Sequence, residues 1–157
     1  MSGAKNKELL VYLSMGFGNP YGDEWNNDIV LNWAEKLINE GVQNISLADT
    51  IGIATPGQIE SLYKLLSGQF PAIELGVHLH SRPDSWREKV EAAYKSGCRR
   101  FDATLKGYGG CPMAKDELTG NIATENVILY LQSQNIDLGL NMSKLQEAMD
   151  YSGKVFD

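Results

Sequence analysis

The sequence predicts an α/β fold in which a parallel sheet is built from four βα units within a single domain over residues 1–157. A β-prone apolar run followed by an amphipathic stretch recurs four times along the chain. The loops that follow the apolar runs are long and polar, whereas the returns to the next run are short and carry a glycine. In parallel α/β folds the loops at the carboxyl ends of the strands carry the chemistry, so the candidate site is expected there.

The first two units have helix boundaries that are visible in the sequence. Residues 8–15 form the first apolar run, and residues 27–40 carry apolar side chains at helical spacing until a glycine ends the stretch. The second run, residues 42–54, is followed by the segment TPGQ at 55–58. Threonine at the N-cap, proline at the first helical position and glutamine closing a capping box predict that a helix starts here.

The third and fourth units repeat this pattern. Residues 73–81 (IELGVHLHS) precede a predicted helix over 83–96, and residues 98–105 (CRRFDATL) form the expected fourth strand. A long glycine-rich loop then leads to a predicted helix over 124–134, and a closing helix is expected over 142–151.

Composition and charge exclude several classes of protein. With 43% hydrophobic and 22% charged residues, the chain has the balance of a soluble globular protein. Its formal charge of −6 argues against binding to nucleic acid or to an anionic membrane, since both draw on a positive field. The chain contains no apolar run long enough for a transmembrane helix and no signal-peptide cleavage site. Two cysteines are too few for a secreted disulfide framework, so a cytoplasmic protein with reduced thiols is expected.

The strongest candidate site is the motif VHLH at 77–80. Side chains alternate along a strand, so His78 and His80 are expected to point the same way, about 6–7 Å apart. One divalent cation can take an imidazole from each of them. Two hydrogen-bonded structural histidines are the alternative. We favour metal ligands because these are the only two histidines in the chain.

The second candidate is the loop KGYGGCPMA at 106–114, which leads to GNIATE at 120–125. Its glycines permit positive φ, as in a mobile lid that closes over a ligand. Cys111 at its tip suits acid–base chemistry or nucleophilic attack, whereas a phosphate-binding or merely flexible loop is the alternative. Asp49, after the second strand, is expected at the rim as a base, ligand or orienting group, or equally as a cap of the next turn.

Four motifs together resemble one enzyme family. ISLADTIG, the HxH in GVHLH, GYGGCPMA and GNIATE look like the carboxyl-terminal half of hydroxymethylglutaryl-CoA lyase and its relatives, over essentially the whole chain. HxH alone also occurs in other metal-dependent lyases and in acyl-CoA-condensing synthases on related (β/α)₈ barrels. GGCPxA followed by GNxATE is far more specific to the lyases.

The resemblance implies both a reaction and the residues that serve it. It implies an acyl-CoA substrate of the 3-hydroxy-3-methylglutaryl-CoA type, cleaved to acetyl-CoA and a β-keto acid. The cofactor would be a divalent metal, Mg²⁺ or Mn²⁺ first and Zn²⁺ as the alternative. The segment SRPDSW at 81–86 departs from the DTYGQ of typical members, so the resemblance does not fix the acyl group. The corresponding residues are the metal ligands His78, His80 and Asn121, the catalytic lid cysteine Cys111, and the acidic site residues Asp49 and Glu125.

Length adds a constraint. A (β/α)₈ barrel needs about 250 residues and eight strands, so four βα units in 157 residues correspond to half a barrel. In the family the other half brings an Arg-Asp pair whose Asp completes the metal site, and this sequence contains no Arg-Asp dipeptide. The isolated chain is therefore expected to be inactive. Its open sheet edges are expected to be covered in a homodimer or by a complementary amino-terminal half-barrel chain.

Three other interpretations stay open. The chain could be a non-catalytic module that binds metal weakly and acts by assembling with a partner. It could also be a small-molecule-binding α/β domain whose GYGG loop holds phosphate, or a fragment of a related acyl-CoA-condensing synthase. GGCPxA with GNxATE favours the lyase over the phosphate-binding domain.

Overall fold

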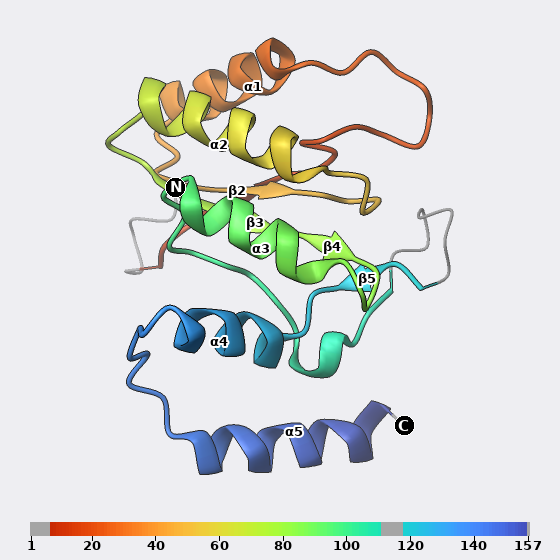
Figure 1. Cartoon of the computed structure of the whole chain (residues 1–157). Helices are drawn as coiled ribbons and strands as arrows, with labels where there is room; N and C mark the ends of the chain where they lie inside the picture. The colour runs from red at the N-terminus through yellow and green to blue at the C-terminus, as the bar shows by residue number, and fades with distance from the viewer. Residues whose placement is uncertain (1–6, 111–117, 157) are drawn as a thin grey trace.

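The computed structural model describes residues 7–110 and 118–156. Its main sheet is parallel, with the strand order β1-β2-β3. Figure 1 shows α1 and α2 above these strands and α3 in front of them. The bounds are β1 (Leu10–Leu13), α1 (Asn27–Asn39), β2 (Asn44–Ala48), α2 (Pro56–Gln69), β3 (Glu74–His78) and α3 (Trp86–Lys95). The predicted α/β fold with a parallel sheet is confirmed.

Two further helices follow below α3 in Figure 1. They are α4 (Thr124–Ser133) and α5 (Met142–Phe156), so the closing helix runs five residues beyond its predicted end at 151. A short 3₁₀ helix, η2 (Leu105–Gly107), precedes Tyr108, whose ring contacts Phe156 of α5 with centroids 5.0 Å apart. None of the helices in the described part of the chain is long and apolar enough to cross a membrane.

The face of the sheet that meets the helices is apolar. Ile45 and Leu47 of β2 are fully buried, as their alternation in the sequence predicts. They share one hydrophobic cluster with Leu75 and Val77 of β3. The helices contribute to the same cluster through Ile59, Leu62, Leu66, Val90 and Ala93. This layer fixes the sheet on one side and leaves the ends of its strands to carry polar groups.

α2 begins as the sequence predicts. The backbone amide of Gln58 donates to Thr55 Oγ1 (3.3 Å), and Gln58 Oε1 accepts from the amide of Thr55 (2.9 Å), which closes the capping box. The returns after α1 and α3 pass through Gly41 and Gly97 at φ of 90° and 102°. Glycine adopts this left-handed conformation without steric cost, which allows the tight returns.

The predicted strand over 98–105 is reduced to two isolated bridges, Phe101 with Val77 and Thr104 with Ala123. This segment pairs with β3 only between Val77 and Phe101. The amide of Cys98 donates instead to a carbonyl at the end of α3 (3.0 Å), and that of Thr104 to the segment before α4 (3.3 Å). The backbone bonds of 98–105 are thus shared among three neighbours, which leaves isolated bridges where a strand was expected.

The segment 73–81, expected as one run, is split into two. β3 ends at His78, and a separate short strand, β4 (His80–Ser81), pairs antiparallel with β5 (Gly120–Asn121). α3 begins at Trp86 and not at residue 83, because residues 82–85 form a turn closed by a 3.2 Å backbone bond. The antiparallel pair was not predicted, and it brings the far end of the glycine-rich loop to the histidines.

Candidate metal centre

Three predicted ligands meet at the carboxyl end of the sheet. His78 closes β3, His80 opens β4, and Asn121 of β5 lies directly opposite His80 in the antiparallel pair. The imidazole rings are in edge-to-face contact, with centroids 5.1 Å apart. The histidines therefore do lie side by side, although they belong to two short strands and not to one.

Each imidazole is oriented by a backbone carbonyl. Nδ1 of His78 lies 3.1 Å from the carbonyl oxygen of Asp102, and Nδ1 of His80 lies 3.0 Å from that of Thr50. A carbonyl oxygen can only accept, so Nδ1 of each neutral ring carries the proton and donates. Each Nε2 is left with its lone pair, the arrangement that metal-binding histidines share.

Asn121 presents an oxygen acceptor to the same place. Its Nδ2 donates to the carbonyls of Tyr108 (3.0 Å) and Gly109 (2.8 Å) at the start of the glycine-rich loop. Its Oδ1 is buried and has no hydrogen-bond partner among the described residues. A buried acceptor without a donor costs free energy unless a ligand satisfies it. The amide nitrogen of Asn121 is thus bonded to the loop, and its oxygen is left for the candidate site.

The protonation state of His80 suits a ligand. Burial is the largest influence on its pKa and lowers it, and the neighbouring His78 acts in the same direction. The Thr50 carbonyl, Asp49 and the amide of Asn121 oppose this shift without reversing it. A neutral imidazole is the form that coordinates a cation, so burial favours the ligand state.

The donor set is two imidazole nitrogens and one amide oxygen. Mg²⁺, Mn²⁺ and Zn²⁺ all accept such mixed nitrogen and oxygen ligands. Over residues 7–110 and 118–156, no group of three or more His, Cys, Asp or Glu side chains is placed to hold a metal ion. The three side chains fit a divalent cation and would supply part of its coordination shell.

Asp49 is not at the rim, so its predicted placement is wrong. Its side chain is 1% exposed, and its Oδ2 accepts from Nζ of Lys89 at 2.8 Å. Its Oδ1 accepts from the amide of Ala54 at 3.1 Å, which makes it a cap of the following turn, one of the roles left open by the sequence. Both carboxylate oxygens are thus occupied by donors of the protein itself.

Lys89 itself was missed by the sequence analysis, although the helical pattern held a signal. It lies on α3 three residues after Trp86 and four before Ala93, so it falls on the apolar face of that helix. A lysine is almost never fully buried unless it is paired, and Lys89 is 5% exposed. The apolar spacing around it could have indicated a buried cation.

Glu125 and Cys111 are related to the glycine-rich loop. Glu125, in the first turn of α4, accepts from the backbone amide of Lys106 at 3.0 Å and so holds the start of the loop. Lys106 has a φ of 56°, which this bond helps to maintain. Cys111 lies outside the described residues. The structure thus places Glu125 at the base of the loop.

Asp102 is a second residue that sequence reasoning did not select. Its carbonyl orients His78, and its carboxylate accepts from Ser46 Oγ at 2.8 Å. The ring of Tyr12 packs edge to face on His78 with centroids 5.6 Å apart. These contacts join β1, β2 and the segment after α3 beneath the histidines, so the inner face of the sheet supports His78.

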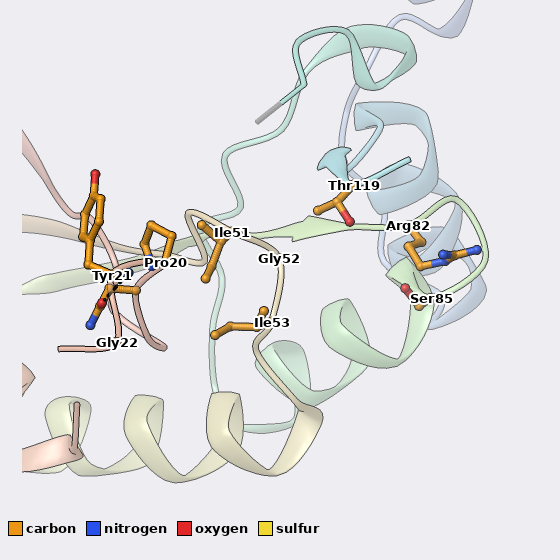
Figure 2. A pocket seen from close by; sticks show the side chains of 10 residues that line it. Pro20, Tyr21, Gly22, Ile51, Gly52, Ile53, Arg82, Ser85 and Thr119 are labelled. Atoms are coloured by element: carbon orange, nitrogen blue, oxygen red, sulfur yellow. Dashed lines mark hydrogen bonds between the residues drawn. The ribbon is translucent and has the colours of Figure 1, made fainter. Parts of the chain in front are cut away.

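A cavity of about 620 Å³ opens beside the site. In Figure 2 the loop through Ile51, Gly52 and Ile53 lies between Pro20 and Tyr21 on one side and Arg82 and Thr119 on the other. Gly52 joins this cavity to the histidines, because a Cβ built on it would lie 3.6 Å from Cβ of His80. A small molecule held there would reach the edge of the candidate metal centre.

Comparison with known proteins identifies the family that the chain resembles. A family model described as HMGL-like matches residues 7–151. The chain is 34% identical over 143 residues to a hydroxymethylglutaryl-CoA lyase of Bacillus subtilis, covering 91% of this chain and 48% of that protein. It is 33% identical over 141 residues to the (R)-citramalyl-CoA lyase of Chloroflexus aurantiacus, covering 90% of this chain and 44% of that protein.

The fold comparison gives the same result. The crystal structure of the Bacillus subtilis HMG-CoA lyase matches with a TM-score of 0.88 and 31% identity, over 98% of this chain and 51% of that one. The chain spans about half the length of the relatives it matches, so the predicted half-barrel is confirmed at the level of the fold. Since the family model covers nearly the whole chain, the chain belongs to the HMGL-like family, that of the hydroxymethylglutaryl-CoA lyases.

Proposed function

We propose that this chain supplies the carboxyl-terminal half of a divalent-metal-dependent carbon–carbon lyase. The proposed reaction cleaves a thioester of the 3-hydroxy-3-methylglutaryl-CoA type to acetyl-CoA and a β-keto acid. One observation carries the proposal: the buried Oδ1 of Asn121 has no partner among the described residues, and it lies opposite His80 in the β4–β5 pair. Two neighbouring imidazoles, each held through Nδ1, complete a set of lone-pair donors that one divalent cation would satisfy together.

His78, His80 and Asn121 would hold the metal, which we propose to be Mg²⁺ or Mn²⁺, with Zn²⁺ as the alternative. When bound, a divalent cation supplies Lewis acidity that favours deprotonation of the tertiary hydroxyl of the substrate. The chain's own contribution is to fix the three donor atoms through the carbonyls of Asp102, Thr50, Tyr108 and Gly109.

The glycine-rich loop is proposed to provide proton transfer. Cleavage leaves a thioester enolate whose carbon must be protonated, and Cys111 is the proposed donor. The start of the loop is tied down by two site residues, since Glu125 accepts from Lys106 and Asn121 donates to the carbonyls at 108 and 109. These bonds link a proposed ligand directly to the segment that carries Cys111, so closure of the loop and filling of the metal centre would be coupled.

A second thioester is proposed as an alternative substrate because the comparisons favour it almost equally. Identity to the (R)-citramalyl-CoA lyase is 33%, against 34% to the hydroxymethylglutaryl-CoA lyase of Bacillus subtilis. Arg82 lines the neighbouring cavity, and it belongs to the segment that departs from typical family members. The acyl group is therefore tested with both thioesters.

Assembly forms part of the proposal. In the described residues β1 is hydrogen-bonded to β2 alone, and Tyr12 on its inner face is 45% exposed. We propose that a second chain, either another copy or a complementary amino-terminal half-barrel, covers this edge and completes the site in the cytoplasm. A non-catalytic assembly module and an acyl-CoA-condensing synthase fragment are the competing outcomes.

The test is a titration of the purified chain with Mn²⁺ by calorimetry. His80→Ala and Asn121→Ala are each expected to weaken binding by about tenfold or more, because each removes one donor of an already incomplete shell. Asn27→Ala on α1 is the matched control and should bind like wild type, since Asn27 bonds to Ser61 on the helical layer. Equal, negligible binding by wild type and both site variants would contradict the metal site.

Assay of the assembled enzyme separates the remaining outcomes. Conversion of either thioester to acetyl-CoA by the chain mixed with a complementary half-barrel would support the lyase. Condensation of acetyl-CoA without cleavage activity would identify a synthase instead, and metal binding with neither activity would identify an assembly module.

A further inference from the structure

Lys89 is a buried charged residue whose N–H groups are all hydrogen-bonded. It lies on α3, and its Nζ donates to three acceptors: Asp49 Oδ2 at 2.8 Å, the carbonyl of Gly52 at 2.9 Å and the carbonyl of His80 at 2.8 Å. An ammonium group has three N–H bonds, so each has one acceptor. Such full pairing is what allows a lysine to remain buried and charged.

Two of these acceptors belong to Asp49 and Gly52, on either side of the residue whose carbonyl orients His80, and the third is the carbonyl of His80 itself. Nδ1 of His80 donates to the carbonyl of Thr50, and Thr50 belongs to the loop that runs from Asp49 to Gly52. Lys89 therefore holds this loop at both ends and, by its third bond, holds the backbone of His80 itself. The ammonium group of Lys89 therefore holds both partners of the orienting bond: His80, the donor, and the loop that carries the acceptor Thr50.

The loop is tied to the other histidine as well. The amide of Asp49 donates to the carbonyl of His78 at 2.9 Å, and Oδ1 of Asp49 accepts from the amide of Ala54 at 3.1 Å. The residue that neutralises Lys89 is thus anchored to the carboxyl end of β3 through its own backbone amide. The network therefore joins the backbones of both histidines, and its ion pair is buried.

We propose that Lys89 is a positioning residue for His80: it holds the loop at 49–52 so that the Thr50 carbonyl keeps the proton of His80 on Nδ1 and leaves Nε2 available to a ligand. This inference rests on the proposed metal centre and deepens it. A buried ion pair by itself contributes little net stability compared with apolar residues of the same shape. Stability alone therefore does not explain why the bonds of Lys89 hold both His80 and the loop that orients its ring.

The design of the variants separates positioning from folding. Lys89→Met alone would leave the charge of Asp49 buried and unpaired, which destabilises the fold strongly. The double variant Lys89→Met/Asp49→Asn removes both charges and keeps an amide oxygen for the bond from Ala54. Lys95→Met is the matched control, because Lys95 lies on the same helix, is exposed and forms an ion pair with Glu91 one helical turn away. Circular dichroism reports whether each variant is folded.

The readout is the tautomer of each imidazole, measured by long-range ¹H–¹⁵N NMR of the side chains without metal. The chain has only two histidines, so their ring signals are few and separable. At about pH 8, where an unperturbed imidazole is neutral, both rings of wild type and of Lys95→Met should be protonated on Nδ1. In the double variant His78 should stay so, whereas His80 should become a mixture of tautomers, and Mn²⁺ affinity should fall about tenfold or more.

Two results would overturn the proposal. One is a wild-type His80 protonated on Nε2, which needs no variant to be seen. The other is a folded double variant whose His80 tautomer and Mn²⁺ affinity match those of wild type. Failure of the proposed metal centre is distinguishable, because wild type would then bind no Mn²⁺ while the tautomer of His80 still depended on Lys89.

Discussion

The ring of His78 meets the ring of His80 edge to face, with centroids 5.1 Å apart and planes at 74°. Each ring is held by a carbonyl from a different segment, Asp102 for one and Thr50 for the other. Because both Nδ1 atoms are engaged in this way, the two Nε2 atoms are the ones left for a ligand. This arrangement would let both rings bind the proposed cation.

The first prediction concerns activity. The purified chain alone, supplied with Mn²⁺, is expected not to convert hydroxymethylglutaryl-CoA to acetyl-CoA at a useful rate. The sequence contains no Arg-Asp dipeptide, and the described residues supply two imidazoles and an amide without a carboxylate ligand. Acetyl-CoA release is the measurement, with a full-length family member as the positive control. Robust metal-dependent turnover by the chain alone would mean that another copy provides the missing ligand.

The second prediction concerns assembly. The chain is expected to form a homodimer that covers the outer edge of β1 and the exposed ring of Tyr12. Sedimentation equilibrium at micromolar concentrations should give twice the monomer mass of 17.3 kDa. Tyr12→Lys should shift the distribution towards monomer, whereas Tyr21→Lys, which changes an exposed tyrosine of the loop before α1, should not. A monomer throughout the concentration range would show that the open edge is covered within the chain.

The third prediction concerns the loop that Lys89 holds. Gly52 has a φ of 72°, and a Cβ added there would lie 2.3 Å from Cγ2 of Thr119. Gly52→Ala is expected to lower the free energy of unfolding by about 1–2 kcal/mol from the left-handed backbone alone, and the close contact adds to this loss. Gly57→Ala is the matched control: Gly57 lies within α2 and has no neighbour within 4 Å of an added Cβ. It should raise the free energy of unfolding by about 0.5 kcal/mol. Urea denaturation measures both changes, and equal effects would refute the strain at Gly52.

The fourth prediction concerns Cys98 and pH. Burial raises the pKa of its thiol from the ordinary value of 9.0, which the unfolded chain retains, to about 11. Between these values the unfolded chain has lost a proton that the folded chain keeps, so the free energy of unfolding falls as pH rises. Urea denaturation from about pH 8 to 11 should show wild type losing on the order of 2 kcal/mol more than Cys98→Ala. Parallel curves would show that the thiol ionises equally in both states.

Much of the fold was determined by local signals in the sequence. The capping box of Thr55 and Gln58 fixed the start of α2, because it is formed by side chains within one helical turn. The tight returns at Gly41 and Gly97 likewise depend on adjacent residues, as does the alternation of Ile45 and Leu47 with Ser46. The motifs around the histidines and the glycine-rich loop identified the family for the same reason, since each lies within a few positions.

The tertiary structure alone decided how these segments meet. The pairing of His80 with Asn121 joins residues on two strands that contain two residues each, too short to show periodicity in sequence. Lys89 and Asp49 lie 40 positions apart in the sequence. No local pattern could therefore show that Asp49 belongs to a buried ion pair and does not lie at the rim. The donors that orient the histidines are backbone carbonyls, which every residue possesses and which only the folded chain distinguishes.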